Sequence, residues 1–456
     1  MSRAKKKSEF ATPYTFKNAI TKGNIFTKLS ALVMGLGNMA NKQIVKGLLF
    51  LAIEVGYIIF MATKGLYYIK MFPSLGWKKQ GEVWNEKLQV YEYSAGDNSV
   101  LLLLYGVVTI AITVLFIYFW LENLKSAYMT QCMKEENAHI PNFREEVYDL
   151  FDKNLHRTLM FLPFTGILIF TILPLLFMIA MAFTNYSVVG EHLVLFDWVG
   201  LKNFKTVLGI GGKLGKTFWP VLGWTLIWAF FATFLNFFLG MILAIVINRK
   251  ETKGKAFWRF CFVLSIAVPQ FVSLLIMRTM LQPEGAINNL LVNAGIINKA
   301  LPFWTNATWA RVSVILINCW IGIPYTMLQI TGVLQNVPVE LYEAAKIDGA
   351  NPVQIYFKIT LPYIMFIMGP YVITQFTGNI NNFNVIFLLS AGQPTPVGRT
   401  AGKTDLLVTW LYNLTVKYQY YNLGAVIGIL TFIVLSIVAL VTYRNTASYK
   451  DEEGFQ

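Results

Sequence analysis

Long apolar runs alternate with short polar stretches along the whole chain. A membrane-spanning helix needs about 20 apolar residues, and the runs have this length. They are continuous and lack the alternation of a barrel strand. The chain is therefore predicted to be all-α, a polytopic membrane protein with about eight transmembrane helices, at residues 44–63, 100–121, 162–183, 224–247, 260–281, 312–334, 363–389 and 425–443.

Composition supports this class. The 456 residues are 55% hydrophobic and only 14% charged, whereas soluble domains have about a quarter of charged residues. The net charge of +14 could indicate a nucleic-acid partner. However, the basic residues lie mostly in loops and tails beside apolar runs, so orientation in the membrane explains them better. The three cysteines are scattered and show no disulfide or metal-site spacing.

Basic residues set the predicted sidedness. Residues 1–43 carry eight Lys or Arg against one acid, and no early apolar core of a signal peptide, so they are predicted to be a retained cytoplasmic tail. Residues 248–259 carry five bases in a dozen residues. The protein is predicted to lie in the plasma membrane. An even number of spans, eight, then places both of these segments and both termini in the cytoplasm. The predicted divisions are 1–43, 44–160 (two spans and a connection), 161–445 (a core of six spans) and a tail, 446–456.

Two other features need an interpretation. Glu54 lies inside the first span, where a carboxylate is costly; it is either functional or, as we favour, a partnered helix-packing residue. Residues 209–217 resemble a phosphate-binding loop, but Ile210 replaces a required glycine and no buried strand precedes the segment. We therefore reject a nucleotide site there. The segment 64–99 mixes charges with aromatic residues and is predicted to be external and interfacial.

A polar stretch between the sixth and seventh runs interrupts the apolar pattern. Pro338 suits the first turn of a short helix, and Gly349 followed by Asn351-Pro352 predicts a turn. A second short helix is predicted from Pro352 to about Thr360, stopped by Leu361-Pro362. We call residues 338–362 the elbow. On these grounds alone, an ordinary interhelical loop is an equally good reading.

The residues of the elbow carry a specific resemblance. Glu343-Ala344-Ala345, Gly349, Ile359 and Leu361-Pro362 resemble the coupling loop of ABC importer membrane subunits. The resemblance implies that the elbow is cytoplasmic and docks into a cleft of a separate ATPase subunit. The contact residues it implies are Glu343, Ala344, Ala345, Asp348, Gly349, Ile359, Leu361 and Pro362.

Two spans beside the elbow are unusually polar. Asn318, Gly322 and Tyr325 share one helix face by their spacing, and Ile321 flanks it. The same spacing recurs in the seventh span for Gln375, Asn379 and Asn382, with Gly378 on the same side. Side-chain amides both donate and accept hydrogen bonds, so a row of them suits the hydroxyl groups of a sugar.

Interhelical hydrogen bonding is the simpler alternative, and it stabilises membrane helices by about 0.6–2 kcal/mol. For a cluster of four Asn opposite a helix bearing Trp and Tyr, we favour a path for a solute. Neither run carries a charge, which argues against ion coupling through these helices and against a strongly ionic substrate.

From about residue 162 to residue 444 the chain resembles the larger membrane subunit of maltose and maltodextrin ABC importers. The matching landmarks include Ala182-Phe-Thr-Asn-Tyr186, Ala267-Val-Pro269 and Ala401-Gly-Lys-Thr-Asp-Leu-Leu407. The resemblance implies a type I ABC importer permease fold and a sugar held in mid-membrane by Asn318, Ile321, Gly322, Tyr325, Gln375, Gly378, Asn379 and Asn382. The segment 184–220 is short here, as in relatives that lack a large extracellular domain.

The resemblance also implies the partners. They are a homologous second membrane subunit, two ATPase subunits, an extracellular solute-binding protein and an oligosaccharide, within the lipid bilayer and without nucleic acid. The chain carries no ATPase motif, so it needs no cofactor of its own; ATP would bind the partner. Two other functions stay open. A secondary transporter would need an ion relay, for which Glu54 is the one candidate, and a membrane enzyme would need clustered Asp, Glu or His, whereas His139, His156 and His192 are dispersed.

Overall fold

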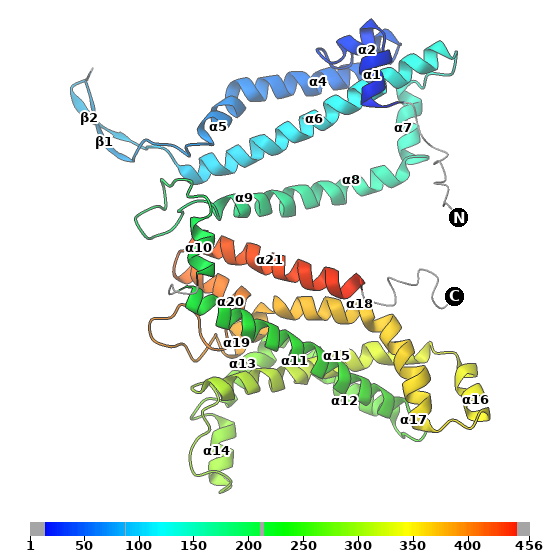
Figure 1. Cartoon of the computed structure of the whole chain (residues 1–456), viewed down its shortest axis with the longest axis vertical. Helices are drawn as coiled ribbons and strands as arrows, with labels where there is room; N and C mark the ends of the chain where they lie inside the picture. Colours follow the sequence, from blue (N-terminus) through cyan, green and yellow to red (C-terminus); the bar gives the residue numbers. More distant parts are fainter. Residues whose placement is uncertain (1–13, 87, 210–213, 445–456) are drawn as a thin grey trace. The chain divides into compact units, whose positions relative to one another are not determined.

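The computed structural model describes residues 14–86, 88–209 and 214–444, and the chain divides into two compact units (Figure 1). Unit 1 comprises Met1–Tyr186 with Gly190–Val199, and unit 2 comprises Ser187–Val189 with Gly200–Gln456. In the described residues, seven helices are long and apolar enough to cross a membrane, or eight if a bent pair counts as one span. The helical membrane fold is therefore confirmed. Residues 210–213 of the segment that resembles a phosphate-binding loop lie outside the described residues, as does the tail at 446–456.

Unit 1 contains three long helical spans. The first runs through α4 (Ile44–Phe60), a π-helical turn (Met61–Gly65) and α5 (Leu66–Met71), and the second is α6 (Ser99–Glu135). The third is α8 (Leu155–Ile167), a π-helical turn (Leu168–Ile172) and α9 (Leu173–Met181), after the short α7 (Phe143–Phe151). Between α5 and α6, strands β1 (Gly81–Asn85) and β2 (Val90–Ser94) form an antiparallel hairpin that the sequence analysis did not predict.

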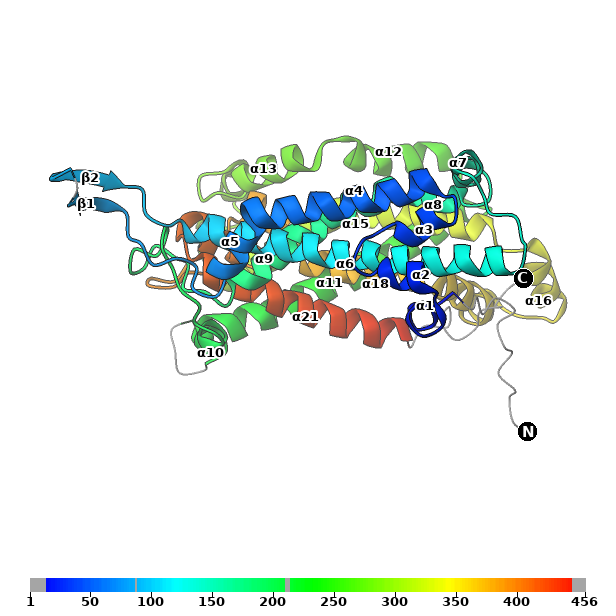
Figure 2. The same ribbon diagram turned by 90° about the horizontal axis from the view of Figure 1, so that it is seen from above.

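The amino-terminal segment is folded onto α6. Helices α1 (Phe16–Lys22), α2 (Ile25–Leu29) and α3 (Leu36–Ala40) precede α4, as both views show (Figures 1 and 2). The Glu54 carboxylate on α4 accepts a hydrogen bond from the Met34 amide at 2.8 Å. Glu54 is thus a partnered packing residue, the alternative that the sequence analysis favoured.

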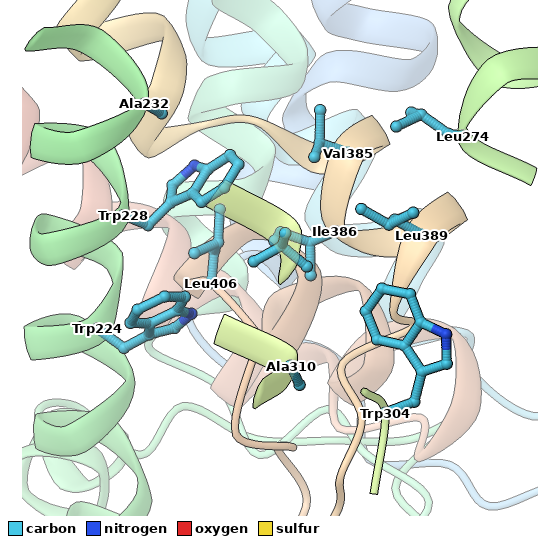
Figure 3. Packing of buried hydrophobic residues seen from close by; sticks show 11 residues of the cluster. Trp224, Trp228, Ala232, Leu274, Trp304, Ala310, Val385, Ile386, Leu389 and Leu406 are labelled. Carbon is cyan, nitrogen blue, oxygen red and sulfur yellow. The ribbon is translucent and has the colours of Figure 1, made fainter. Parts of the chain in front are cut away.

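Unit 2 is built around three packed helices, α11 (Gly215–Asn248), α15 (Ala307–Gln335) and α18 (Leu361–Ile380). Buried apolar residues of all three helices form one core, which includes Met241, Met327, Ile330 and Ile364. A second core contains Trp224, Trp228 and residues of other helices (Figure 3). The remaining elements are α10 (Lys202–Leu208), α12 (Lys255–Ala267), α13 (Gln270–Met280), α14 (Ala286–Asn293), α16 (Val339–Ile347), α17 (Pro352–Ile355), α19 (Phe383–Leu389), α20 (Leu407–Tyr412) and α21 (Tyr421–Arg444).

Contacts along α11 and α15 show that these helices run parallel. Asn236 packs against Gly322 near their middles, and the Asn248 side chain donates to the Thr331 hydroxyl at 3.1 Å near their carboxyl ends. The chain must therefore return along the full length of α15 between them. The bent pair α12 and α13 makes this return, since Arg259 contacts Asn248 at one end and Leu274 belongs to the Trp304 and Ala310 core at the other. The pair is consequently one broken span, which gives eight.

Three helix boundaries differ from the prediction. The fifth span is not continuous, because the backbone bends by 84° at Val268-Pro269, where Pro269 cannot donate to the preceding turn. The seventh span ends at Ile380, and α19 starts separately at Phe383. The second elbow helix is not stopped by Leu361-Pro362. Instead α17 continues into α18 through a π-helical turn at Tyr356–Thr360, and such a turn accommodates the missing amide and the ring of Pro362.

The segment Ala401–Leu407 packs against the first half of α11. The Trp224 indole donates to the Thr404 carbonyl at 3.1 Å, and the Leu407 amide donates to the Thr225 hydroxyl at 3.1 Å. Asp405 is buried and accepts from the Gly402 amide at 2.7 Å and the Thr409 hydroxyl at 2.8 Å. Burial raises the pKa of the Asp405 carboxyl, although these hydrogen bonds oppose the shift. The contacts fix this loop on the helix that carries part of the site.

Candidate functional site

A small polar pocket lies between α11, α15 and α18. Three of the predicted substrate residues line it, namely Gly322, Tyr325 and Gln375. The pocket encloses about 40 Å³, which holds water but is too small for a sugar ring. Asn236 lies near the middle of the apolar run at residues 224–247, so the pocket lies about halfway along the apolar part of α11.

The wall supplied by α11 was missed in the sequence analysis. Thr233 and Asn236 line the pocket from this helix, and Thr326 and Tyr371 line it from the other two. Asn236 is 7% exposed; its amide nitrogen donates to the Ala232 carbonyl at 2.7 Å. Its side-chain oxygen is buried and has no hydrogen-bond partner among the residues that the structure describes. Asn236 is the one Asn in the apolar span predicted at residues 224–247, and this is the signal that could have identified this wall.

Asn379 and Asn382 form a continuous hydrogen-bond chain beside the pocket. The Asn379 amide donates to the Thr233 hydroxyl at 3.0 Å, and its backbone carbonyl accepts from the Trp228 indole at 3.0 Å. Asn382 donates to the Asn379 side-chain oxygen at 3.3 Å and accepts from the Val385 amide at 3.2 Å. Asn382 is therefore the N-cap of α19 and not part of the α18 face, because the helix ends at Ile380. The prediction that Asn382 shares a helix face with Gln375 and Asn379 was therefore wrong.

The other predicted substrate residues lie outside the pocket lining. Asn318 and Ile321 are half-buried on α15, and Gly378 is exposed on α18 with open space around the position of a Cβ atom. Of the aromatic side chains on α18 and α19, Phe376 lies 6.4 Å from Phe234 by ring centroids, and Phe383 stacks on Phe387 at 4.8 Å. These two rings therefore take part in packing within unit 2.

Gly322 is packed against α11 more tightly than any side chain would permit. A Cβ atom at Gly322 would overlap the amide of Asn236, which is itself buried. We expect Gly322→Ala to destabilise the purified protein by about 1–3 kcal/mol, since overpacking forces helices apart. Gly332→Ala is the matched control on the same helix, because nothing lies within 4 Å of its Cβ position. Thermal unfolding should show a lower Tm for Gly322→Ala alone, and equal Tm values would contradict the close packing.

The elbow presents an exposed surface. Helix α16 ends at Ile347, and Gly349 follows in the left-handed region with φ of +75°. A hydrogen bond of 3.2 Å between the hydroxyl groups of Tyr342 and Thr360 joins α16 to the base of α18. Ile347 is 86% exposed. Of the coupling residues that the resemblance implies, those exposed are Glu343, Ala344, Asp348, Gly349 and Pro362, whereas Ala345, Ile359 and Leu361 are half-buried.

Comparison with known proteins decides the family. Residues 236–447 match the family described as binding-protein-dependent transport system inner membrane component. The galactooligosaccharides transport system permease protein GanP of Bacillus subtilis (strain 168) is 36% identical over 429 residues, covering 93% of this chain and 98% of GanP. The chain belongs to the family of ABC importer permeases. It is a transport subunit and not an enzyme.

Two further similarities agree with this membership. The permease MdxF, of the maltodextrin transport system of the same bacterium, is 34% identical over 451 residues, covering 96% of this permease and 99% of MdxF. A solved bacterial alginate ABC transporter, in complex with an alginate pentasaccharide-bound periplasmic protein, contains a chain that is 22% identical. The TM-score is 0.55, and the match covers 66% of this permease and 98% of that chain, which shows the type I permease fold. Permeases of this family work with a binding protein and an ATPase.

Proposed function

We propose that this permease is the translocation subunit of an ATP-driven importer of uncharged oligosaccharides, with maltodextrins as the leading substrates. The observation that carries the proposal is the uncharged polar wall at mid-depth, where Asn236 has an unsatisfied buried oxygen and Asn379 and Gln375 add amides. Hydroxyl groups of a sugar can donate to and accept from these side chains. The names of MdxF and GanP support this class of substrate.

The pocket as described is a closed state of this proposed site. A sugar requires α15 and α18 to separate, so that Asn318, Ile321, Gly378 and Asn382 join Gly322, Tyr325, Gln375 and Asn379 around it. The residues that line the closed pocket already come from α11, α15 and α18, the three helices that would surround the sugar. Alternating access by rearrangement of helices around a fixed site is consistent with this arrangement.

The elbow is proposed to be cytoplasmic and to dock into the ATPase. The parallel course of α11 and α15 supports this sidedness, since it brings the basic segment after α11 and the elbow after α15 to the same end of unit 2. That segment contains Arg249, Lys250, Lys253, Lys255 and Arg259, and basic loops favour the cytoplasmic side. Exposed Ile347, beside Glu343 and Asp348, gives a partner both an apolar and an acidic contact. A homologous second membrane subunit and two ATPase subunits complete the proposed assembly, with both termini in the cytoplasm.

A secondary, ion-coupled transporter is disfavoured by the contact of Glu54. Its carboxylate accepts a hydrogen bond from the Met34 amide, so it has a structural role in holding the amino-terminal segment. An importer of another oligosaccharide is the closer competitor, because GanP and MdxF are almost equally similar.

Competition between sugars separates these substrates. Uptake of labelled maltotriose should be inhibited by unlabelled maltose and longer maltodextrins at micromolar concentrations. Galactooligosaccharides should inhibit it far more weakly. Inhibition by galactooligosaccharides alone would move the assignment to that class, and inhibition by neither would remove the oligosaccharide proposal.

A further inference from the structure

The amino-terminal segment is fixed to α6 by a ladder of buried polar contacts. Gln131 accepts from the Asn24 amide at 2.8 Å and from the Thr27 hydroxyl at 2.9 Å. Nearer the amino end of α6, Asn123 accepts from the Gly35 amide at 2.8 Å. We call residues 16–40, which comprise α1 to α3, the amino-terminal hook. Its backbone is held at several levels of one helix face, so it is a built element rather than a loose tail.

The hook contacts α6 at the position where the apolar stretch of this helix ends. The Trp120 indole donates to the Ala31 carbonyl at 2.9 Å, and Phe16 contacts the Trp120 ring at 5.6 Å between centroids. Charged residues begin two positions later, at Glu122. A Trp at the boundary between apolar and charged sequence is typical of the membrane interface.

The outer side of the hook is apolar. The large side chains that stay exposed in unit 1 include Ile25, at 73%, and Leu32, at 76%. Ile20, Phe26 and Leu29 are between 41% and 52% exposed. Beneath them Ala19, Thr27 and Ser30 are buried against α6. The segment is therefore amphipathic, with one side held by protein and the other facing outward.

Positive charge accompanies the apolar side. Lys17, Lys22 and Lys28 are exposed, and residues 14–43 contain no Asp or Glu. Within the described part of the chain, no carboxylate lies within ion-pair distance of these three lysines. A lipid surface that bears phosphate groups complements both the charge and the apolar side chains.

We propose that the amino-terminal hook lies in the membrane interface and binds anionic phospholipid through Lys17, Lys22 and Lys28. Its apolar side chains enter the boundary between headgroups and acyl chains, while the lysines reach the phosphate groups. The ladder on α6 sets the depth of the segment. A protein partner would instead need an apolar surface ringed by carboxylates.

Native mass spectrometry of the purified complex, titrated with phosphatidylglycerol or phosphatidylcholine, tests the proposal. The triple variant Lys17→Gln, Lys22→Gln, Lys28→Gln should bind phosphatidylglycerol at least about tenfold more weakly, because each lysine near an anionic surface contributes about 1 kcal/mol. Phosphatidylcholine binding should not change. The matched control replaces Lys202, Lys205 and Lys299, which are also exposed, with Gln and should keep phosphatidylglycerol binding. Unchanged binding in the first variant, or equal loss in both, would overturn the proposal.

A spin label identifies what covers the apolar side. A nitroxide attached at position 32 of an otherwise cysteine-free complex, reconstituted in vesicles containing phosphatidylglycerol, should be accessible to oxygen and protected from a water-soluble nickel chelate. A label that is immobile and inaccessible to both reagents would show that a protein partner covers the segment. Free access to the nickel chelate would show that the hook faces water. Either result would contradict the proposal that the hook binds lipid, and neither would affect the proposed transport function.

Discussion

Replacing Gly349 with proline is expected to uncouple ATP hydrolysis from sugar uptake. Gly349 has φ of +75° and donates its amide to the Lys346 carbonyl at 3.1 Å. Proline fixes φ near −65° and has no amide hydrogen, so the turn after α16 cannot keep its geometry. Backbone strain of roughly 1–3 kcal/mol corresponds to a 5- to 150-fold shift between conformations of the elbow. Uptake and ATP hydrolysis by the reconstituted complex should show lost uptake with sugar-independent hydrolysis.

Gly349→Asn is the matched control for this variant. Asparagine tolerates the left-handed region better than other residues with a side chain, and nothing lies within 4 Å of the Cβ position at Gly349. The Asn variant should therefore retain most of the coupled uptake. Normal coupled uptake by Gly349→Pro would show that the elbow turn does not transmit the force of the ATPase.

Asn379→Ala is expected to raise the KM for sugar uptake by about tenfold, while the amount of protein in the membrane stays normal. The reason is that a lost hydrogen bond costs about 1 kcal/mol, and a buried partner left without a hydrogen bond costs more. The change removes the donor to Thr233 and the acceptor for Asn382. Initial uptake rates over a range of maltotriose concentrations, normalised to membrane protein, measure the effect.

Asn381→Ala is the control, since Asn381 is exposed, next to the helix end, and outside the hydrogen-bond chain. If the Asn379 chain only joins helices, Asn379→Ala should lower the Tm and leave the KM unchanged. A changed KM at unchanged Tm supports the substrate role. Equal KM values for Asn379→Ala, Asn381→Ala and the native permease would remove Asn379 from the site.

The spans were predictable because the apolar runs are long and bilayer thickness leaves few alternatives to a helix. The helix breaks were less predictable. Pro269 and Pro362 look alike in sequence, yet the first produces an 84° bend and the second is absorbed by a π-helical turn. Which outcome occurs depends on whether neighbouring groups satisfy the freed carbonyls, and this is a property of packing.

The candidate site was predicted in part. Gly322, Tyr325 and Gln375 do converge on one pocket, because helical spacing places them correctly on their own helices. Thr233 and Asn236 line the pocket because of the way α11 packs against α15 and α18. The spacing of residues within one helix does not reveal this packing. Asn382 was misplaced because the periodicity argument assumed a helix that in fact ends two residues earlier. The amino-terminal hook was also missed, since its helices of five to seven residues are too short for a periodic pattern.

ATP-dependent uptake is the direct test of the proposed transport function. The purified permease, with its second membrane subunit, ATPase and binding protein, is reconstituted in liposomes that hold ATP inside, and labelled maltotriose is added outside with the binding protein. The sugar should accumulate only when both ATP and the binding protein are present. Variants at Glu343 or Gly349 should abolish this accumulation. Accumulation by the permease alone, or accumulation driven by an ion gradient without ATP, would contradict the proposed function.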